Sequence, residues 1–346
     1  MPAHKRNFSM QAYWNHMAEG LEPVLHFKGE TPADWAAWRQ EAYPKLMDLL
    51  GPFPRPAPLN AEVECAVEDN GIIRERVVFD SEEGMSVPCW VLHPKDMPAD
   101  RSNPAILCSH GHGPFGKDAV AGIRSSPAHV AAIAEANYNY GEQMARAGFL
   151  TICPDLRGFG ERRDGPDPFP GRDPCNVNLI KGALMGVYLL ALDIWDMKRC
   201  IDYLETRPEV DPQRIGMMGL SQGGTMTTFT SAVEPRIKAV DIICYVNPWR
   251  GFAVERANFC GSQMVPGLMR YLDTDDIAGL IAPRPLLMEM GIFDNCFYIE
   301  DTLAGYEGVR RIYRAAGAED RLWADIFPGP HSFGGNKAFE FFRKYL

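Results

Sequence analysis

The chain has 346 residues, of which 46% are hydrophobic and 23% charged, and its 35 basic and 45 acidic side chains give a formal net charge of −10. A chain of this length buries enough apolar surface to fold without disulfide or metal staples. The acidic balance, with no run of Lys or Arg, argues against nucleic acid and anionic membrane surfaces as partners. No apolar stretch reaches the roughly 20 residues that a bilayer span needs, so we expect no membrane partner.

The first twenty residues lack the apolar core and the small-residue cleavage site of a secretory signal. The nine cysteines stand singly, with no CxxC pair. Both features predict free, mostly buried thiols in a cytoplasmic protein. We expect neither a cofactor nor a metal ion.

Aromatic and aliphatic residues recur at helical spacing between residues 11 and 50. Thr31 followed by Pro32 is typical of a helix start, with Thr31 as the N-cap. The proline-rich run 51–58 then breaks the helix and forms a stiff connector. We therefore expect residues 1–60 to form a helical extension and residues 61–346 to form one α/β domain.

After residue 60 the hydrophobic period changes to two, which is typical of strands. Residues 61–67, 72–80 and 85–93 are separated by turn sequences and predict an antiparallel meander. Strand and helix patterns then alternate, which predicts a mostly parallel sheet with helices on both faces. The expected strands are 104–109, 150–154, 214–220, 237–245, 285–290 and 322–327, and the expected helices are 140–147, 179–205, 223–233, 298–316 and 337–345.

The strongest local motif is Gly219-Leu-Ser221-Gln-Gly223, which lies between a predicted strand and a predicted helix. A serine in this context sits on a tight turn that exposes its hydroxyl, and the small flanking residues let the backbone make the turn. The hydroxyl becomes a nucleophile only beside a base that a third group orients. Ser221 is therefore a candidate catalytic nucleophile.

The partners of such a serine follow it along the chain, first an acid and then a histidine, at the ends of later strands. Asp294 comes just after the strand predicted at 285–290, and His331 lies in the loop after the strand predicted at 322–327. Glu289 is a rival acid, but it falls inside its strand, where we expect it to point away or to pair with a helix residue. We predict Asp294 and His331 as the catalytic partners.

Two backbone N–H groups are needed to hold the charge that develops on an attacked carbonyl oxygen. Gln222, directly after the serine, supplies one, and we expect the other from His112 in the turn His110-Gly111-His112. The two histidines could instead hold a metal ion, but no carboxylate or thiolate stands at ligand spacing beside them. His110 is interpreted as a loop brace.

Two further segments are expected to surround the site. Arg157 lies in a charged loop after the strand predicted at 150–154, where we favour ion pairs that hold the loops, with substrate binding by Arg157 as the alternative. Residues 247–275 carry aromatic side chains without a strand pattern, and we favour a partial cap that lines a substrate pocket. Trp249, Phe252 and Phe259 are the predicted substrate contacts.

The Gly219–Gly224 elbow, the His110-Gly111-His112 turn, the Arg157-Gly158 turn and the segments ending at Asp294 and His331 resemble the acetyl xylan esterase and cephalosporin C deacetylase group of α/β hydrolases. They are also similar to related bacterial acetylesterase-like hydrolases with a longer N-terminal helical region. The resemblance covers residues 60–346.

This resemblance implies an α/β-hydrolase fold, a triad of Ser221, Asp294 and His331, and hydrolysis of short-acyl or acetylated carbohydrate esters. It also implies that the backbone N–H groups of His112 and Gln222 form the oxyanion hole. The chain departs from the group's pattern at two residues, as well as in the long segment 113–139 and in the extra helices before residue 51.

His112 stands where those esterases typically carry tyrosine, and Phe159 stands where they usually carry glutamine. These departures concern the sugar-acetate substrate and not the hydrolase chemistry. Dienelactone hydrolases share the architecture but commonly use cysteine as the nucleophile, and Ser221 argues against that group.

The sequence predicts a serine ester hydrolase that acts on a small-molecule ester, and two other functions are the alternatives. A serine peptidase of the prolyl-oligopeptidase type uses the same order of catalytic residues, but that group normally carries a large added domain, for which residues 1–60 are too short. A non-catalytic binding protein on a hydrolase scaffold is disfavoured by the complete set of Ser, Asp and His. The sequence is compatible with a homo-oligomer and leaves the oligomeric state open.

Overall fold

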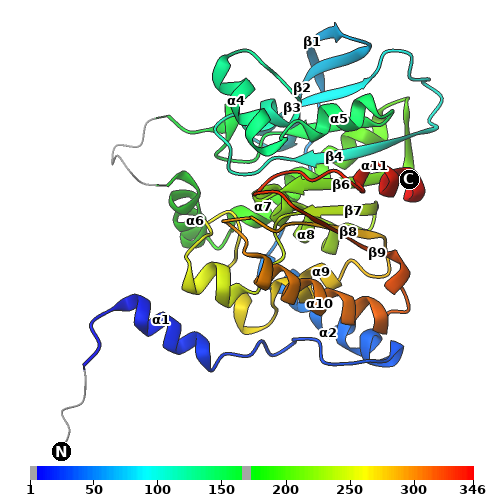
Figure 1. The fold of residues 1–346 in the computed structure, drawn as a ribbon. Helices are drawn as coiled ribbons and strands as arrows, with labels where there is room; N and C mark the ends of the chain where they lie inside the picture. The colour runs from blue at the N-terminus through cyan, green and yellow to red at the C-terminus, as the bar shows by residue number, and fades with distance from the viewer. Residues whose placement is uncertain (1–5, 166–172) are drawn as a thin grey trace, which may run out of the picture.

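A nine-stranded mixed sheet forms the centre of the computed structural model, which describes residues 6–165 and 173–346 (Figure 1). The strand order is β1-β2-β3-β5-β4-β6-β7-β8-β9. The first three strands are β1 (Glu62–Asp69), β2 (Ile72–Glu82) and β3 (Met85–Pro94). They form the predicted antiparallel meander, and β3 continues the sheet by pairing antiparallel with β5.

The other six strands are parallel to one another, which confirms the predicted α/β class. They are β4 (Asn103–Ser109), β5 (Leu150–Pro154), β6 (Val210–Leu220), β7 (Ile237–Ile243), β8 (Leu286–Gly291) and β9 (Leu322–Phe327). Because the carboxyl ends of parallel strands meet at one edge of a sheet, the loops after β4, β6, β8 and β9 come together there.

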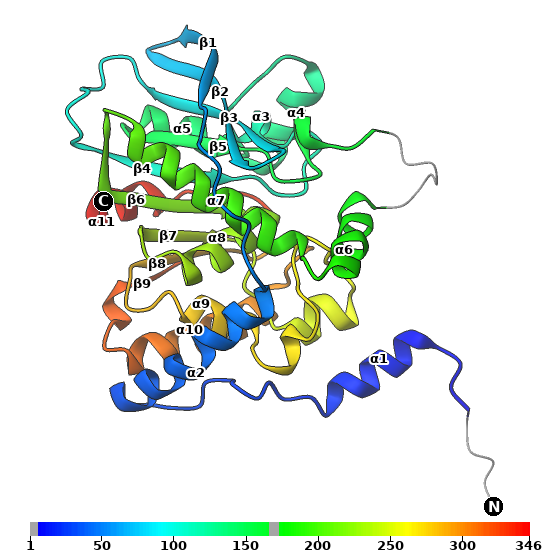
Figure 2. The same ribbon diagram turned by 180° about the vertical axis from the view of Figure 1, so that it is seen from behind.

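Helices cover both faces of the sheet (Figure 2). The side chains on the two faces belong to two separate cores. Alternation along a strand sends Leu107 and Met217 to one core, and their neighbours Ile106 and Met218 to the other. The first core includes α7 (Leu189–Thr206), α8 (Gln222–Val233), α9 (Thr274–Gly279) and α10 (Ile299–Ala315), and the second includes α3 (Lys117–Val120), α5 (Tyr140–Arg146) and α11 (Ala338–Tyr345).

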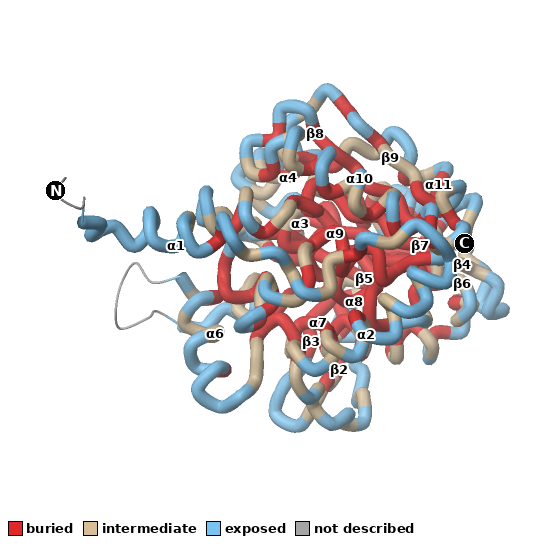
Figure 3. The backbone as a smooth tube through the Cα atoms, turned by 90° about the horizontal axis from the view of Figure 1, so that it is seen from below, coloured by how far each residue is buried: buried red, intermediate tan, exposed pale blue. Residues whose placement is uncertain are grey.

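The N-terminal region forms two helices, α1 (Met10–Glu19) and α2 (Pro32–Leu50). Thr31 caps α2 as predicted, since its side chain accepts from the Asp34 N–H while the Asp34 carboxylate accepts from the Thr31 N–H. Leu46 and Leu50 are buried in the first core of the sheet. Helix α1 projects from the body of the molecule and is mostly exposed (Figure 3).

The helix predicted at 179–205 is in fact two helices, α6 (Pro174–Met185) and α7, bent by 97°. Gly186 causes the break by adopting a left-handed conformation with φ 73° at the end of α6. No single helix in the described ranges is long and apolar enough to cross a membrane, and α6 and α7 reach that length and composition only when taken together.

The long segment 113–139 holds α4 (Pro127–Ala136) as well as α3, and the Ser126 side chain caps α4. The remaining short helices are η1 (Gly160–Arg162), the π-helix η2 (Arg250–Glu255), η3 (Leu268–Arg270) and η4 (Glu319–Arg321).

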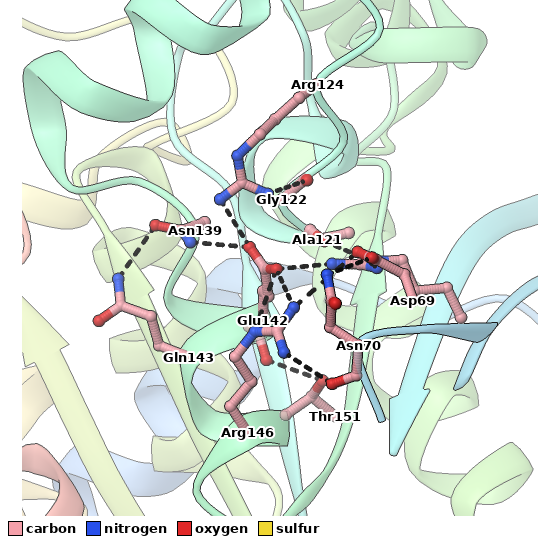
Figure 4. A network of polar contacts seen from close by, with 12 residues as sticks. Asp69, Asn70, Ala121, Gly122, Arg124, Asn139, Glu142, Gln143, Arg146 and Thr151 are labelled. Atoms are coloured by element: carbon pink, nitrogen blue, oxygen red, sulfur yellow. Dashed lines mark hydrogen bonds and ion pairs between the residues drawn. The ribbon is translucent and has the colours of Figure 1, made fainter. Parts of the chain in front are cut away.

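A buried carboxylate, Glu142 of α5, ties segment 113–139 to the meander (Figure 4). It accepts hydrogen bonds from Arg74 at 2.6 Å, from Arg124 and Arg146 at 2.9 Å, and from Asn139 at 2.8 Å. Burial alone would raise the pKa of Glu142, but these hydrogen bonds outweigh burial and lower the pKa. The network therefore fixes the chain directly next to residue 138, which contacts the site described below.

Candidate active site

Ser221 occupies a strained turn between β6 and α8. Its φ of 64° and ψ of −117° lie in a region that non-glycine residues rarely adopt. The flanking glycines are required by space, because a Cβ on Gly219 would lie 2.5 Å from the Gly223 carbonyl oxygen and one on Gly223 would lie 2.1 Å from the Ser109 carbonyl oxygen. The motif thus forms the tight strand-to-helix turn that the sequence predicts.

His331 and Asp294 are joined by a hydrogen bond of 2.7 Å between Nδ1 and Oδ2. The second oxygen of the buried Asp294 carboxylate accepts from the backbone N–H groups of Cys296 at 2.7 Å and Phe297 at 2.9 Å. The Phe297 ring stacks on the imidazole with centroids 5.6 Å apart. The carboxylate and the ring therefore hold the imidazole in one orientation and leave Nε2 for another partner.

Ser221 and His331 line the same cavity, which has a volume of about 420 Å³. Asp294 lies directly behind His331. Within the described residues Ser221 Oγ makes no hydrogen bond to His331, so the structure brings the three predicted residues to one place without closing the full chain of hydrogen bonds. Catalytic hydrogen bonds of this kind often tighten only when substrate binds.

Glu289, the rival acid, lies in β8 and contacts the loop that carries His331. Its carboxylate accepts from the backbone N–H groups of Gly334 at 2.8 Å and Gly335 at 3.1 Å. The partner is therefore a loop and not the helix residue that was one of the two expectations, and Glu289 is not among the described residues that line the Ser221 cavity. Burial, with a smaller contribution from nearby Asp325, raises the pKa of Glu289 to about 8.

The turn that carries His112 packs directly on the Ser221 turn. A Cβ on Gly111 would lie 2.7 Å from the Leu220 carbonyl oxygen and 3.0 Å from Ser221 Cβ. The Gly111 N–H donates to the Tyr138 hydroxyl at 2.6 Å, which fixes the turn from the other side. His112 lines the cavity beside Ser221.

Gln222, the other predicted oxyanion donor, is the first residue of α8. Its backbone N–H has no partner inside the helix, since the first N–H groups of any helix lack one. Its side-chain Nε2 donates to the Ser262 carbonyl oxygen at 3.1 Å, which ties the start of α8 to the 247–275 segment.

His110 acts as the predicted brace. Its Nε2 accepts from the Leu156 N–H at 3.0 Å, and its Nδ1 donates to the Gly111 carbonyl oxygen at 2.7 Å. Burial lowers the pKa of His110, which agrees with a neutral ring. The two bonds tie the loop after β5 to the turn that carries His112.

Arg157 is a structural residue in the loop after β5, as the favoured interpretation predicts. Its guanidinium binds both carboxylate oxygens of Asp196, at 2.8 and 2.7 Å, and Glu82 at 2.7 Å. Only 7% of the residue is exposed. In the part of the chain that the structure describes, Arg157 is not among the residues that line the Ser221 cavity.

Residues 257–263 form one wall of the cavity and contain Phe259, the one predicted substrate contact that reaches it. Trp249 lines a neighbouring apolar cavity of about 170 Å³, which Phe259 also borders. Phe252 is fully buried and packs against Tyr245 and Phe297, with centroids 6.1 and 5.4 Å apart. The large aromatic side chains of this segment thus pack mainly into the core. The expectation that Phe252 lines the substrate cavity is wrong.

A thiol site on the cavity wall is absent from the sequence-based predictions. His112 Nε2 lies 2.9 Å from Cys260 Sγ. A hydrogen bond from Cys175, and to a smaller extent one from His112, lowers the pKa of the Cys260 thiol to about 5. Burial acts in the other direction and would raise this pKa. The three residues are far apart in sequence, so no spacing rule could have grouped them. As predicted, all nine cysteines are free and most of them are buried.

The mostly parallel sheet, the serine on its strained turn and the Asp294–His331 pair at the same edge define an α/β hydrolase. The chain belongs to the Abhydrolase family, whose model matches residues 2–324.

Individual proteins extend this likeness. YtaP of Bacillus subtilis, named as a hydrolase, is 27% identical over 292 residues, which are 82% of this chain and 90% of YtaP. A Bacteroides fragilis structure named as an acetyl xylan esterase has a TM-score of 0.74 at 18% identity and covers 93% of this chain and 83% of its own. A glucuronoyl esterase from Solibacter usitatus has a TM-score of 0.68 at 16% identity, covering 94% and 99%.

Proposed function

We propose that the protein is a serine carboxylic-ester hydrolase that acts on short-acyl esters, including acetylated carbohydrates, through an acyl-enzyme. The observation that carries the proposal is the shared cavity of Ser221 and His331, with His331 bound to Asp294 at 2.7 Å. In this proposal residues 61–346 form the catalytic domain, with residues 247–275 as a partial cap.

The proposed reaction uses each residue for one task. His331 Nε2 takes the proton from Ser221 Oγ as the oxygen attacks the ester carbonyl, and it returns the proton to the departing alcohol. Asp294 holds the Nδ1–H tautomer and stabilises the charged ring. The backbone N–H groups of His112 and Gln222 bind the oxyanion. Water then attacks the acyl-enzyme by the same route and releases the acid.

The substrate class is supported by two observations. A cavity of about 420 Å³ has the size of a small-ligand site. The similar folds from Bacteroides fragilis and Solibacter usitatus carry names of carbohydrate esterases.

A panel of p-nitrophenyl esters from acetate to decanoate, run beside acetylated sugars and a peptide p-nitroanilide, tests the proposal. We expect the highest kcat/KM for the shortest acyl chains and no cleavage of the anilide. Ser221→Ala should lose at least ~10³-fold in kcat and keep its fold by circular dichroism. Retention of more than about a few percent of the activity by this variant would reject Ser221 as the nucleophile.

A further inference from the structure

Three nitrogen and sulfur donor groups outside the proposed triad meet on the wall of the Ser221 cavity. They are His112 after β4, Cys175 in the first turn of α6, and Cys260 in the segment after η2. Their donor atoms all lie within 4.8 Å of one another. Three separate stretches of the chain therefore present an imidazole and two thiols to one point.

The surrounding contacts hold these donors in place. The Gly261 N–H donates to the Asn176 side chain at 2.8 Å, which ties the Cys260 segment to α6. The Cys260 N–H donates to the Gln263 side chain at 3.0 Å. The Phe159 ring packs edge-on against the His112 imidazole, with centroids 5.4 Å apart. Neighbouring residues therefore hold the three donor groups in place, in addition to the contacts that the donors make with one another.

We propose that His112, Cys175 and Cys260 bind one divalent ion, zinc or a similar transition metal. The bound ion would link three segments of the cavity wall. Two thiolates and one imidazole form a donor set that zinc uses with a fourth position left for water. Thiolate sulfur also selects against calcium and magnesium, which take oxygen ligands. His112 and Cys260 line the cavity, which gives the ion a path from solvent.

Asp173 adds to the case for this site. It lines the same cavity, two residues before Cys175. Its Oδ1 accepts from the Asn176 N–H as the N-cap of α6, so the cap and the proposed ion would share the first turn of this helix. An ion held here would stabilise the folded state over the unfolded state, because the unfolded chain does not bring the three donors together.

Metal binding, and not hydrolysis, tests this inference, so its outcome is independent of the proposed function. The full chain is reduced, stripped of metal with a chelator and titrated with Zn²⁺ by calorimetry, and with Co²⁺ by absorption. We expect one ion per chain, a thiolate-to-cobalt charge-transfer band in the near ultraviolet, and a rise in melting temperature with Zn²⁺.

Cys175→Ser and Cys260→Ser should each weaken zinc binding at least ~10-fold and diminish the charge-transfer band. Cys296→Ser is the matched control, because Cys296 lines the same cavity but stands outside the cluster, and it should bind zinc like the wild type. Three results would each overturn the proposal: no thiolate band in the wild-type protein, unchanged affinity in Cys175→Ser, or loss of binding in Cys296→Ser. The wild-type cobalt spectrum decides the matter even where a variant fails to fold.

Discussion

The His331 imidazole and the Asp294 carboxylate lie 37 residues apart in sequence and meet through a hydrogen bond of 2.7 Å at the cavity edge. Only one carboxylate oxygen faces the imidazole, since the other is held by the backbone N–H groups of Cys296 and Phe297. The backbone that directly follows Asp294 therefore holds its carboxylate in place, and the carboxylate in turn orients the His331 imidazole.

This arrangement predicts a large catalytic effect for Asp294→Asn. The amide keeps the shape of the side chain but favours the wrong tautomer of His331, so kcat for p-nitrophenyl acetate should fall by roughly 10⁴-fold with little change in KM. Steady-state kinetics measure the loss, and thermal unfolding checks that the fold is intact. A well-folded variant within about tenfold of wild-type kcat would show that Asp294 does not orient the base.

The Tyr138 hydroxyl is expected to act on catalysis through the His112 turn. Tyr138→Phe removes the acceptor of the Gly111 N–H and leaves a donor without its partner, which costs about 1–3 kcal/mol. We expect kcat to fall more than KM changes, because the turn positions an oxyanion donor. Tyr298→Phe, at an exposed tyrosine, is the control and should leave both constants unchanged. Equal effects of the two substitutions would contradict this role.

Glu142 is predicted to be important for stability. Glu142→Gln removes the negative charge that partners the buried Arg74, and breaking such a buried pair costs about 3–5 kcal/mol of unfolding free energy. Urea denaturation measures the loss. Glu307→Gln breaks an exposed pair with Arg310 and should cost less than about 1 kcal/mol. Similar losses in both variants would mean that the buried network contributes little.

Glu289 predicts a specific dependence of stability on pH. The pKa of this carboxyl is raised from its ordinary value of 4.5 to about 8 in the folded protein, so the folded state holds a proton that the unfolded state releases between these values. The free energy of unfolding therefore decreases as pH rises from 4.5 to 8 because of this group. Glu289→Gln cannot ionise, so its stability relative to wild type should increase between pH 5 and pH 8. Urea denaturation at each pH measures the free energy of unfolding of both proteins. If the two proteins depend on pH in the same way, the raised pKa of Glu289 is contradicted.

Local sequence signals were sufficient for much of the fold. The Thr31 cap, the β9 strand and the turn at Ser221 each depend on neighbouring residues, and each occurs as expected. The break between α6 and α7 is not part of the sequence prediction, although Gly186 adopts the left-handed conformation typical of a helix end. Ser126 followed by Pro127 is likewise typical of a helix start, and α4 begins there.

The site could be predicted only where the order of strands determined it. Asp294 and His331 follow strands whose carboxyl ends meet at one edge, so their proximity followed from topology. The contact between His112 and Cys260, by contrast, depends on how two loops fold over the sheet. The position of Phe252 could not be predicted for a related reason, since nothing in the sequence pattern of 247–275 shows that the short helix η2 turns this aromatic side chain into the core.

Mapping the product of a fluorophosphonate reaction tests the central claim most directly, because the reagent traps a serine only where a base activates it. Peptide mass spectrometry of the labelled protein should find one adduct per chain, located on Ser221. The adduct should be absent from Ser221→Ala and should form far more slowly in His331→Ala. An adduct at another residue, or labelling of His331→Ala at the wild-type rate, would contradict the account.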